Sequence, residues 1–195
     1  MKQAFKLMMI TITLIVSAAQ TSQANSTLNV LAIGDMKLQV KMSNIQGRAT
    51  SFIKDENGKI LSRKRVKIGE EVNLIYDVSD LTDGVYFLTL KDESKSQTVP
   101  FRLIGDEIKV QSEDFKKTFF PKLVKEEDEM LVKLLSDESN DLHIDIRSSN
   151  GDHLYYERIE GKIGLIGKRF KFNPGSYLVS ISSNDYAETT PITFE

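Results

Sequence analysis

The chain has 195 residues, a formal net charge of −2 and no cysteine. Such a weakly acidic chain lacks the basic footprint that nucleic acids require, so the composition argues against a nucleic-acid partner. The absence of cysteine excludes disulfides, thiolate zinc sites, a cysteine nucleophile and a lipid-modified cysteine anchor. We therefore expect a fold that is held together by apolar burial alone.

Residues 1–24 have the pattern of a secretory signal peptide. Two lysines precede an apolar run at residues 7–16, and small residues follow the run. Ser22 and Ala24 stand where signal peptidase requires small side chains, which favours a cut before Asn25, although an earlier cut also fits. The run is shorter than the ~20 residues of a membrane-spanning helix. The pattern thus predicts an exported protein (periplasmic, cell-surface or extracellular) without a transmembrane anchor, with a buried N-terminal helix as the alternative.

The rest of the chain, from residue 25 onward, consists of short segments in which apolar and polar residues alternate. Leu142, Ile144 and Ile146, for example, alternate with polar neighbours, which is the period-two pattern of a strand with one buried face. Clusters of turn-forming residues separate the segments. Residues 126–135 are the one candidate for a helix. These patterns predict an all-β fold.

The sequence repeats itself at a spacing of roughly ninety residues, longer than the ~20–50 residues of a solenoid repeat. Each copy contains an Asn-Gly turn, then a Gly-x-Tyr strand, then a strand led by proline. The paired features are Asn57-Gly58 with Asn150-Gly151, Gly84 and Tyr86 with Gly175 and Tyr177, and Pro100 with Pro191. We therefore predict two tandem immunoglobulin-like antiparallel β-sandwiches, at residues 25–105 and 106–195.

The hairpin at the Asn-Gly turn of each module is expected to contain a one-residue bulge. A two-residue turn would mix the apolar and polar faces, whereas a type I turn followed by a glycine at positive φ keeps them apart. The expected pairs are Ile53 with Leu61, Ile146 with Leu154, Ile144 with Tyr156, His143 with Glu157 and Arg147 with His153. The Gly-x-Tyr strands resemble the tyrosine corner of Greek-key sandwiches, in which the ring is buried and the hydroxyl bonds to the backbone. A simple buried aromatic is the alternative, and both interpretations are structural.

The segments DENGKILSRKRV and VSDLTDGVYFLTLKDESKSQTVPFRL resemble the C-terminal sorting domain of type IX (Por) secretion cargo. That family typically shows an Asn-Gly turn, a Leu-x-x-Gly-x-Tyr strand and a final strand. Residues 130–195 are more similar to small immunoglobulin-like modules of unknown function in secreted proteins of the same bacteria. The chain departs from the sorting family because no large domain precedes the module and the last residues are not a basic strand. The resemblance implies a β-sandwich of the cell envelope and supplies no catalytic residue.

Few residues are candidates for chemistry or binding. His143 beside Glu157 would form a general-base pair, but exposed cross-strand histidines are the simpler interpretation. The acidic residues 126–129 lack the glycine-turned spacing of a calcium loop, so a solvated strand end is favoured. Phe119 and Phe120 are the candidate partner-binding residues, because exposed aromatics stack on sugars or anchor proteins. Packing in the seam between the modules is the alternative.

The leading hypothesis is an exported, non-catalytic binding or structural protein with an unknown protein or glycan partner. No phosphate loop, nucleophile elbow or metal motif stands in the sequence, and each module is small for an active-site cleft, so no catalytic, cofactor-binding or metal residue is predicted. A sorting or surface-anchoring role in type IX secretion is the second hypothesis. A hydrolase centred on His143 and Glu157 is the third.

Overall fold

The computed structural model describes residues 13–15, 27–43, 45, 47–66, 72–136, 139–184 and 186–195. The expected signal peptide and its cleavage site lie outside these residues, apart from strand β1 (Thr13–Ile15). β1 pairs antiparallel with β15 (Gly164–Lys171), with Leu14 opposite Lys168. Three residues of the expected signal peptide thus pair with an edge of the β11-β12-β15 sheet. The backbone groups of an edge strand offer such a ladder to any extended segment.

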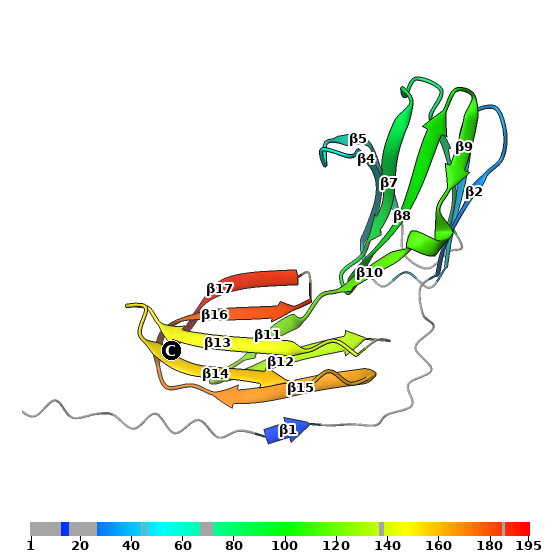
Figure 1. Ribbon diagram of the computed structural model, residues 1–195. Helices are drawn as coiled ribbons and strands as arrows, with labels where there is room; N and C mark the ends of the chain where they lie inside the picture. The colour runs from blue at the N-terminus through cyan, green and yellow to red at the C-terminus, as the bar shows by residue number, and fades with distance from the viewer. Residues whose placement is uncertain are drawn as a thin grey trace, which may run out of the picture. The chain divides into compact units, whose positions relative to one another are not determined.

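The described residues form two compact units, an N-terminal unit within Thr21–Thr118 and a C-terminal unit within Phe119–Glu195, to which β1 adds. One sheet of the N-terminal unit has the order β2-β3-β6, and the other has the order β5-β4-β7-β8, with β9 and β10 beside β8 (Figure 1). The pairs with a determined register are antiparallel. The strands are β2 (Thr27–Ala32), β3 (Lys37–Ser43), β4 (Ala49–Asp55), β5 (Ile60–Val66), β6 (Val72–Asp77), β7 (Gly84–Lys91), β8 (Lys95–Ile104), β9 (Glu107–Val110) and β10 (Lys116–Phe119), with a 3₁₀ turn at Ser112–Asp114.

The C-terminal unit repeats this topology. Its sheets have the orders β11-β12-β15 and β14-β13-β16-β17. The strands are β11 (Lys122–Glu126), β12 (Glu129–Ser136), β13 (Leu142–Ser148), β14 (His153–Ile159), β15, β16 (Gly175–Ser183) and β17 (Tyr186–Phe194). Each strand of the C-terminal unit thus has a counterpart in the N-terminal unit, which has β9 and β10 in addition. This order confirms the predicted all-β fold of two tandem immunoglobulin-like antiparallel sandwiches. The candidate helix at residues 126–135 is wrong, because β12 alternates strictly between inward and outward side chains.

The division between the units differs from the expected one at residues 105 and 106. After β8 the chain turns at Gly105, and β9 pairs back onto β8 with Leu103 opposite Ile108. The backbone hydrogen bonds of residues 107–110 therefore belong to the N-terminal unit. The units meet instead at Thr118 and Phe119.

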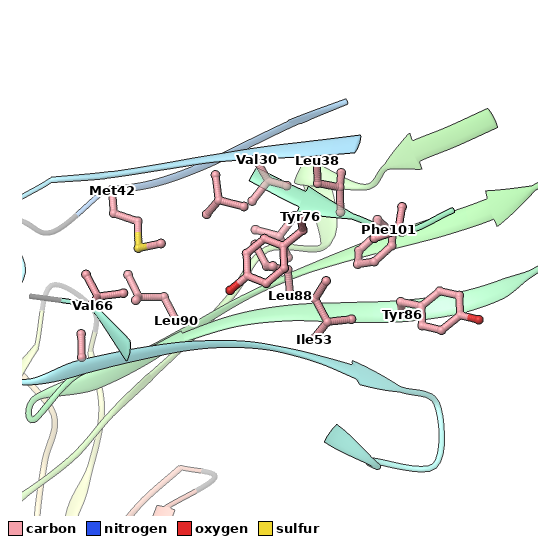
Figure 2. Close-up of a cluster of buried hydrophobic side chains, with 14 of the residues drawn as sticks. Val30, Leu38, Met42, Ile53, Val66, Tyr76, Tyr86, Leu88, Leu90 and Phe101 are labelled. Atoms are coloured by element: carbon pink, nitrogen blue, oxygen red, sulfur yellow. The ribbon is translucent and has the colours of Figure 1, made fainter. Parts of the chain in front are cut away.

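The core of each unit comes from the inward face of every strand. In the N-terminal unit Leu38, Ile53, Leu88 and Phe101 are at most 1% exposed, and Figure 2 shows Tyr76 projecting between the two sheets beside them. In the C-terminal unit the inward side chains of β12, β13 and β16 are fully buried; they include Met130, Val132, Leu134, Ile144, Ile146 and Val179. Each such side chain contributes about 1.5–3 kcal/mol by leaving water, which suffices to hold small units without disulfides.

The β4-β5 and β13-β14 hairpins each turn on a glycine at positive φ, +81° at Gly58 and +89° at Gly151, as predicted. The register beyond the turn is not the predicted one. Lys54 pairs with Ile60 as the bulged turn requires, but a second irregularity follows and Ile53 faces Ser62. In the second hairpin Arg147 pairs with His153 as expected, whereas Ile146 faces Tyr155 and Ile144 faces Glu157. Leu61 and Leu154 have no opposite residue in these ladders, and this extra bulge turns the rest of each strand over.

The two tyrosines are structural twins. The Tyr86 hydroxyl donates a hydrogen bond of 2.7 Å to the carbonyl oxygen of Thr82, and the Tyr177 hydroxyl donates one of 3.0 Å to that of Asn173. Both rings are buried. The acceptor lies four residues upstream of the tyrosine in each case, as in a tyrosine corner. The prediction of matched structural roles is confirmed.

Candidate functional site

The structure places the predicted partner-binding pair, Phe119 and Phe120, in different surroundings. Phe119 is 7% exposed and belongs to the apolar core of the C-terminal unit. The prediction that it forms part of a binding surface is therefore wrong. Phe120 is half-buried, and its ring lies 5.0 Å from that of Tyr186. Because successive side chains of an extended segment point in opposite directions, they cannot both enter one core. The pair therefore supplies packing within the unit, and neither ring presents an open platform.

The structure instead gathers polar side chains on the outward face of the sheet β14-β13-β16-β17. Cross-strand pairing sets three rows over the four strands: Arg158, His143, Ser182 and Ala187; Tyr156, Asp145, Ser180 and Thr189; and His153, Arg147, Leu178 and Pro191. We call this surface the polar face. Its inward counterparts are apolar core residues, so the alternation of the strands alone determines which side chains it presents.

A shallow groove of about 480 Å³ lies on the polar face. Its lining consists of hydroxyl, carboxylate, imidazole and amide groups from β13, β14 and β16: Asp141, His143, Asp145, Tyr156, Ser180, Ser182 and Asn184. The Tyr156 side chain is 58% exposed, and its hydroxyl lies 3.1 Å from Nδ1 of His143. Ser180 and Thr189 share a hydroxyl–hydroxyl hydrogen bond of 2.8 Å. The groove thus combines an exposed ring with hydrogen-bond donors and acceptors on a rigid sheet.

The carboxylates of the groove are held by neighbouring hydrogen-bond donors. Asp145 accepts a hydrogen bond of 3.0 Å from Nη2 of Arg147, and Nε2 of His153 lies 3.5 Å from it. Asp141 accepts one of 2.8 Å from the amide of Gly161 and one of 2.7 Å from Nε of Arg158. These two hydrogen bonds keep the pKa of Asp141 below its ordinary value, and the one from Gly161 has the larger effect. Asp141 therefore stays ionised, and the hydrogen bonds fix both carboxylates in position as acceptors.

The predicted cross-strand pairing of His143 with Glu157, on which the hydrolase hypothesis depended, is wrong. His143 pairs across the strands with Arg158, because the second bulge moves Glu157 opposite Ile144. Glu157 consequently points into the sandwich, where its carboxylate accepts hydrogen bonds from Lys168 and Tyr155. The imidazole and the carboxylate lie on opposite faces of one sheet, and this removes the geometry on which the hydrolase hypothesis depended.

The acidic residues 126–129 form the turn between β11 and β12, with Glu127 at φ +47°. Glu126 and Glu129 face Arg169, whose Nη1 lies 2.5 Å from Glu129, and Asp128 pairs with Lys171 at 2.9 Å. These ion pairs fit the favoured interpretation of a solvated strand end. Throughout the part of the chain that the structure describes, no group of three histidine or acidic side chains is placed to hold a metal ion.

The polar face has a sequence pattern, an alternation of polar and buried residues, that a search for isolated motifs does not detect. His143, Asp145 and Arg147 alternate with buried residues, and so do Ser180 and Ser182. Each strand by itself is an ordinary amphipathic strand. Only the pairing of β13 with β14 and β16, which brings segments far apart in the sequence side by side, makes a groove of them.

A comparison with family models finds one match. Residues 24–104 match the family described as the secretion system C-terminal sorting domain. This segment coincides with the N-terminal unit up to the end of β8. The N-terminal unit of this β-sandwich protein is thus similar to a type IX sorting domain, and the match indicates export by that route. Among the described residues, no helix is both long and apolar enough to cross a membrane.

The other comparisons concern whole chains. No curated protein matches the sequence. Among solved structures, a segment of two fibronectin type III domains from chicken tenascin is 12% identical, with coverage of 86% of this chain and 97% of that chain and a TM-score of 0.29. Domains FN1–FN3 of chicken CNTN1 are 9% identical (83% and 61%, TM-score 0.28), and the BSP domain of a biofilm associated protein is 10% identical (82% and 27%, TM-score 0.27). The fold assignment above depends on strand order and register, not on these values.

Proposed function

We propose that the protein is an exported, non-catalytic binding protein of the bacterial cell envelope. In this proposal the N-terminal unit is the element that the type IX secretion machinery handles, and the C-terminal unit binds a neutral glycan in the groove of the polar face. The observation that carries the binding role is the groove itself, in which the exposed ring of Tyr156 stands beside fixed acceptors and hydroxyls.

A glycan suits this chemistry better than an apolar or a strongly charged ligand. A sugar ring presents a C–H face, which stacks on an aromatic ring, and hydroxyls that both donate and accept hydrogen bonds. The groove offers acceptors in Asp141 and Asp145 and hydroxyls in Ser180 and Ser182. Since Arg147 and Arg158 already pair with the two acids, the groove has little net charge left to attract an ion.

The same arrangement supports a non-catalytic role. Asp141 and Asp145 are committed to arginines, and Ser180 shares a hydrogen bond with Thr189. Ser182 lies opposite His143 in the ladder, but Nδ1 of His143 lies against the Tyr156 hydroxyl, and no hydrogen bond joins Ser182 to His143 among the described residues. The groove is also open to solvent, whereas enzyme sites usually bury most of their substrate.

Binding is tested by titrating the purified mature protein with neutral oligosaccharides of the envelope by calorimetry. Tyr156→Ala should weaken the interaction at least tenfold, which corresponds to about 1.4 kcal/mol. Tyr156→Phe, which keeps the ring, should retain most of the affinity. Ile163→Ala is the matched control, because Ile163 is 76% exposed and lies outside the groove. Equal affinities of the Tyr156→Ala variant and the control would exclude the groove as the binding site.

The sorting role is favoured by the family match and has its own test. The full-length chain is expressed in two strains of one bacterium, with and without an active type IX system, and its amounts at the surface and in the medium are measured. We expect export only in the active strain. Equal export in both strains would exclude type IX sorting.

A further inference from the structure

The N-terminal unit presents a basic surface on the same sheet face that is polar in the C-terminal unit. Cross-strand pairing places Arg65 beside Thr50 and Lys91, and Arg63 beside Phe52 and Thr89. A third row holds Lys54, Phe87 and Pro100, and Arg102 follows at the end of β8 opposite Val85. We call this surface the basic face, and define it by Phe52, Lys54, Arg63, Arg65, Phe87, Lys91 and Arg102.

Among the residues that the structure describes, no carboxylate pairs with the arginines of the basic face. Arg63, Arg65 and Arg102 are exposed, and none of them forms an ion pair in the part of the chain that the structure describes. Lys54 lies over the ring of Phe52, with Nζ 5.0 Å from its centroid. Glu107 on β9 pairs with Lys109, the residue opposite Arg102, at 3.4 Å. Like charges gathered on one face repel one another, which is a cost that an acidic partner would relieve.

The fold does not require these side chains. The positions of Arg63, Phe52 and Arg102 correspond in the C-terminal unit to Tyr156, Asp145 and Thr193, and the same strand order forms with either set. Arginine and half-buried phenylalanine on a flat sheet are the composition of a protein interface, where arginine and aromatic residues supply most of the binding energy. Because one face of one unit has this composition and its structural repeat does not, the difference points to a specific partner.

We propose that the basic face docks the N-terminal unit onto an acidic surface of a protein of the secretion machinery. This inference rests on the proposed sorting function and adds to it the surface and the chemistry of recognition. The arginines would pair with carboxylates of the partner, and Phe52 and Phe87 would contact its apolar groups. Since the attraction is electrostatic, it determines the encounter rate and the orientation of the docked chain.

The test uses the full-length chain in the strain with an active type IX system. The charge reversal R63E/R65E/R102E should lower the exported fraction at least tenfold, with accumulation in the periplasm. K41E/K59E/K162E is the matched control, because it makes the same change of charge at exposed lysines outside the basic face and should be exported normally. R63Q/R65Q/R102Q removes the charges without reversing them and should be exported several-fold less than the wild type.

Three outcomes separate the possibilities. If the wild type is exported equally without the type IX system, the proposed sorting function is wrong, and the basic face is not tested by the variants. If the wild type depends on that system and R63E/R65E/R102E is exported like the control, the basic face is not the docking surface. If both arginine triples are exported normally but lose retention on sulfated dextran, the face binds an anionic polysaccharide, and the protein-docking proposal is overturned. Unchanged circular dichroism and thermal midpoints of the purified variants establish that each is folded.

Discussion

Lys168 and Glu157 form an ion pair between the sheets of the C-terminal unit, with the Lys168 residue only 5% exposed. The Tyr155 hydroxyl joins them, and its ring packs edge-on against Phe170 at 5.3 Å. The pair explains how β14 places a carboxylate inward without leaving a charge unmatched. Removing one partner of such a pair exposes the other to an apolar interior, which is the costly change.

Glu157→Ala should therefore destabilise the C-terminal unit by about 2–3 kcal/mol, less than for a fully buried pair because the Glu157 side chain is one-third exposed. The double variant Glu157→Leu with Lys168→Met should recover most of the loss, since apolar groups of similar size then replace both charges. Urea unfolding followed by tyrosine fluorescence measures both. A double variant less stable than Glu157→Ala would contradict this account.

The stability of the same unit should fall in acid. Burial raises the pKa of Glu157, but the hydrogen bonds from Lys168 and Tyr155 outweigh it, so the folded-state pKa lies below the ordinary value of 4.5. A carboxyl with a lowered pKa stabilises the folded state above its unfolded pKa, and this contribution is lost as the pH falls through the folded pKa. Between pH 7 and pH 3 the urea midpoint should drop more for the wild type than for Glu157→Gln. Parallel pH profiles would mean that the pair has no such role.

Gly58→Val and Gly151→Val should each destabilise their unit by about 1–3 kcal/mol. Both glycines have φ between +80° and +90°, and a Cβ built at either would meet no atom within 4 Å. The loss would thus come from backbone strain rather than from a clash. Asn57→Ala, in the same turn, is the control and should change stability far less. A loss below half a kcal/mol for either valine variant would argue against a left-handed glycine.

Phe119→Ser should cost about 3–5 kcal/mol and Phe120→Ser about 1 kcal/mol, measured by thermal or urea unfolding. Phe119 fills the core of the C-terminal unit, and large-to-small changes there leave a cavity. Phe120 loses mainly its contact with Tyr186. Two equal losses would contradict the different placements of the two rings.

Much of the fold could be predicted from the sequence, because strand alternation and the repeated Gly-x-Tyr element have direct physical causes. The glycine turns and the tyrosine hydrogen bonds are found where the pattern predicts them. The register of β14 could not be predicted, because the bulge at Leu154 appears only in the pairing of β14 with β13. The ion pair of Glu157 with Lys168, a residue of another strand, follows from that register. Because of this one bulge Tyr156 faces solvent and Tyr155 faces the core, the reverse of the prediction.

The groove and the basic face could be predicted only in part for a related reason. The alternation of β13 identifies His143 and Asp145 as outward, but nothing local shows that Ser180 and Tyr156 lie beside them. Phe119 and Phe120 stood out in the sequence because they are adjacent aromatics. Their burial depends on the point at which the chain enters the C-terminal unit. The boundary expected at residue 106 placed this point too early in the sequence.

The central claim, that the N-terminal unit directs export, is tested most directly by transferring it. Residues 25–118 are fused to the C-terminus of a folded periplasmic reporter, and the amounts of reporter at the surface and in the medium are measured with and without an active type IX system. A fusion with residues 119–195 is the control. The account predicts export of the first fusion only, and only in the active strain. A reporter with residues 25–118 that stays in the periplasm of the active strain would contradict it.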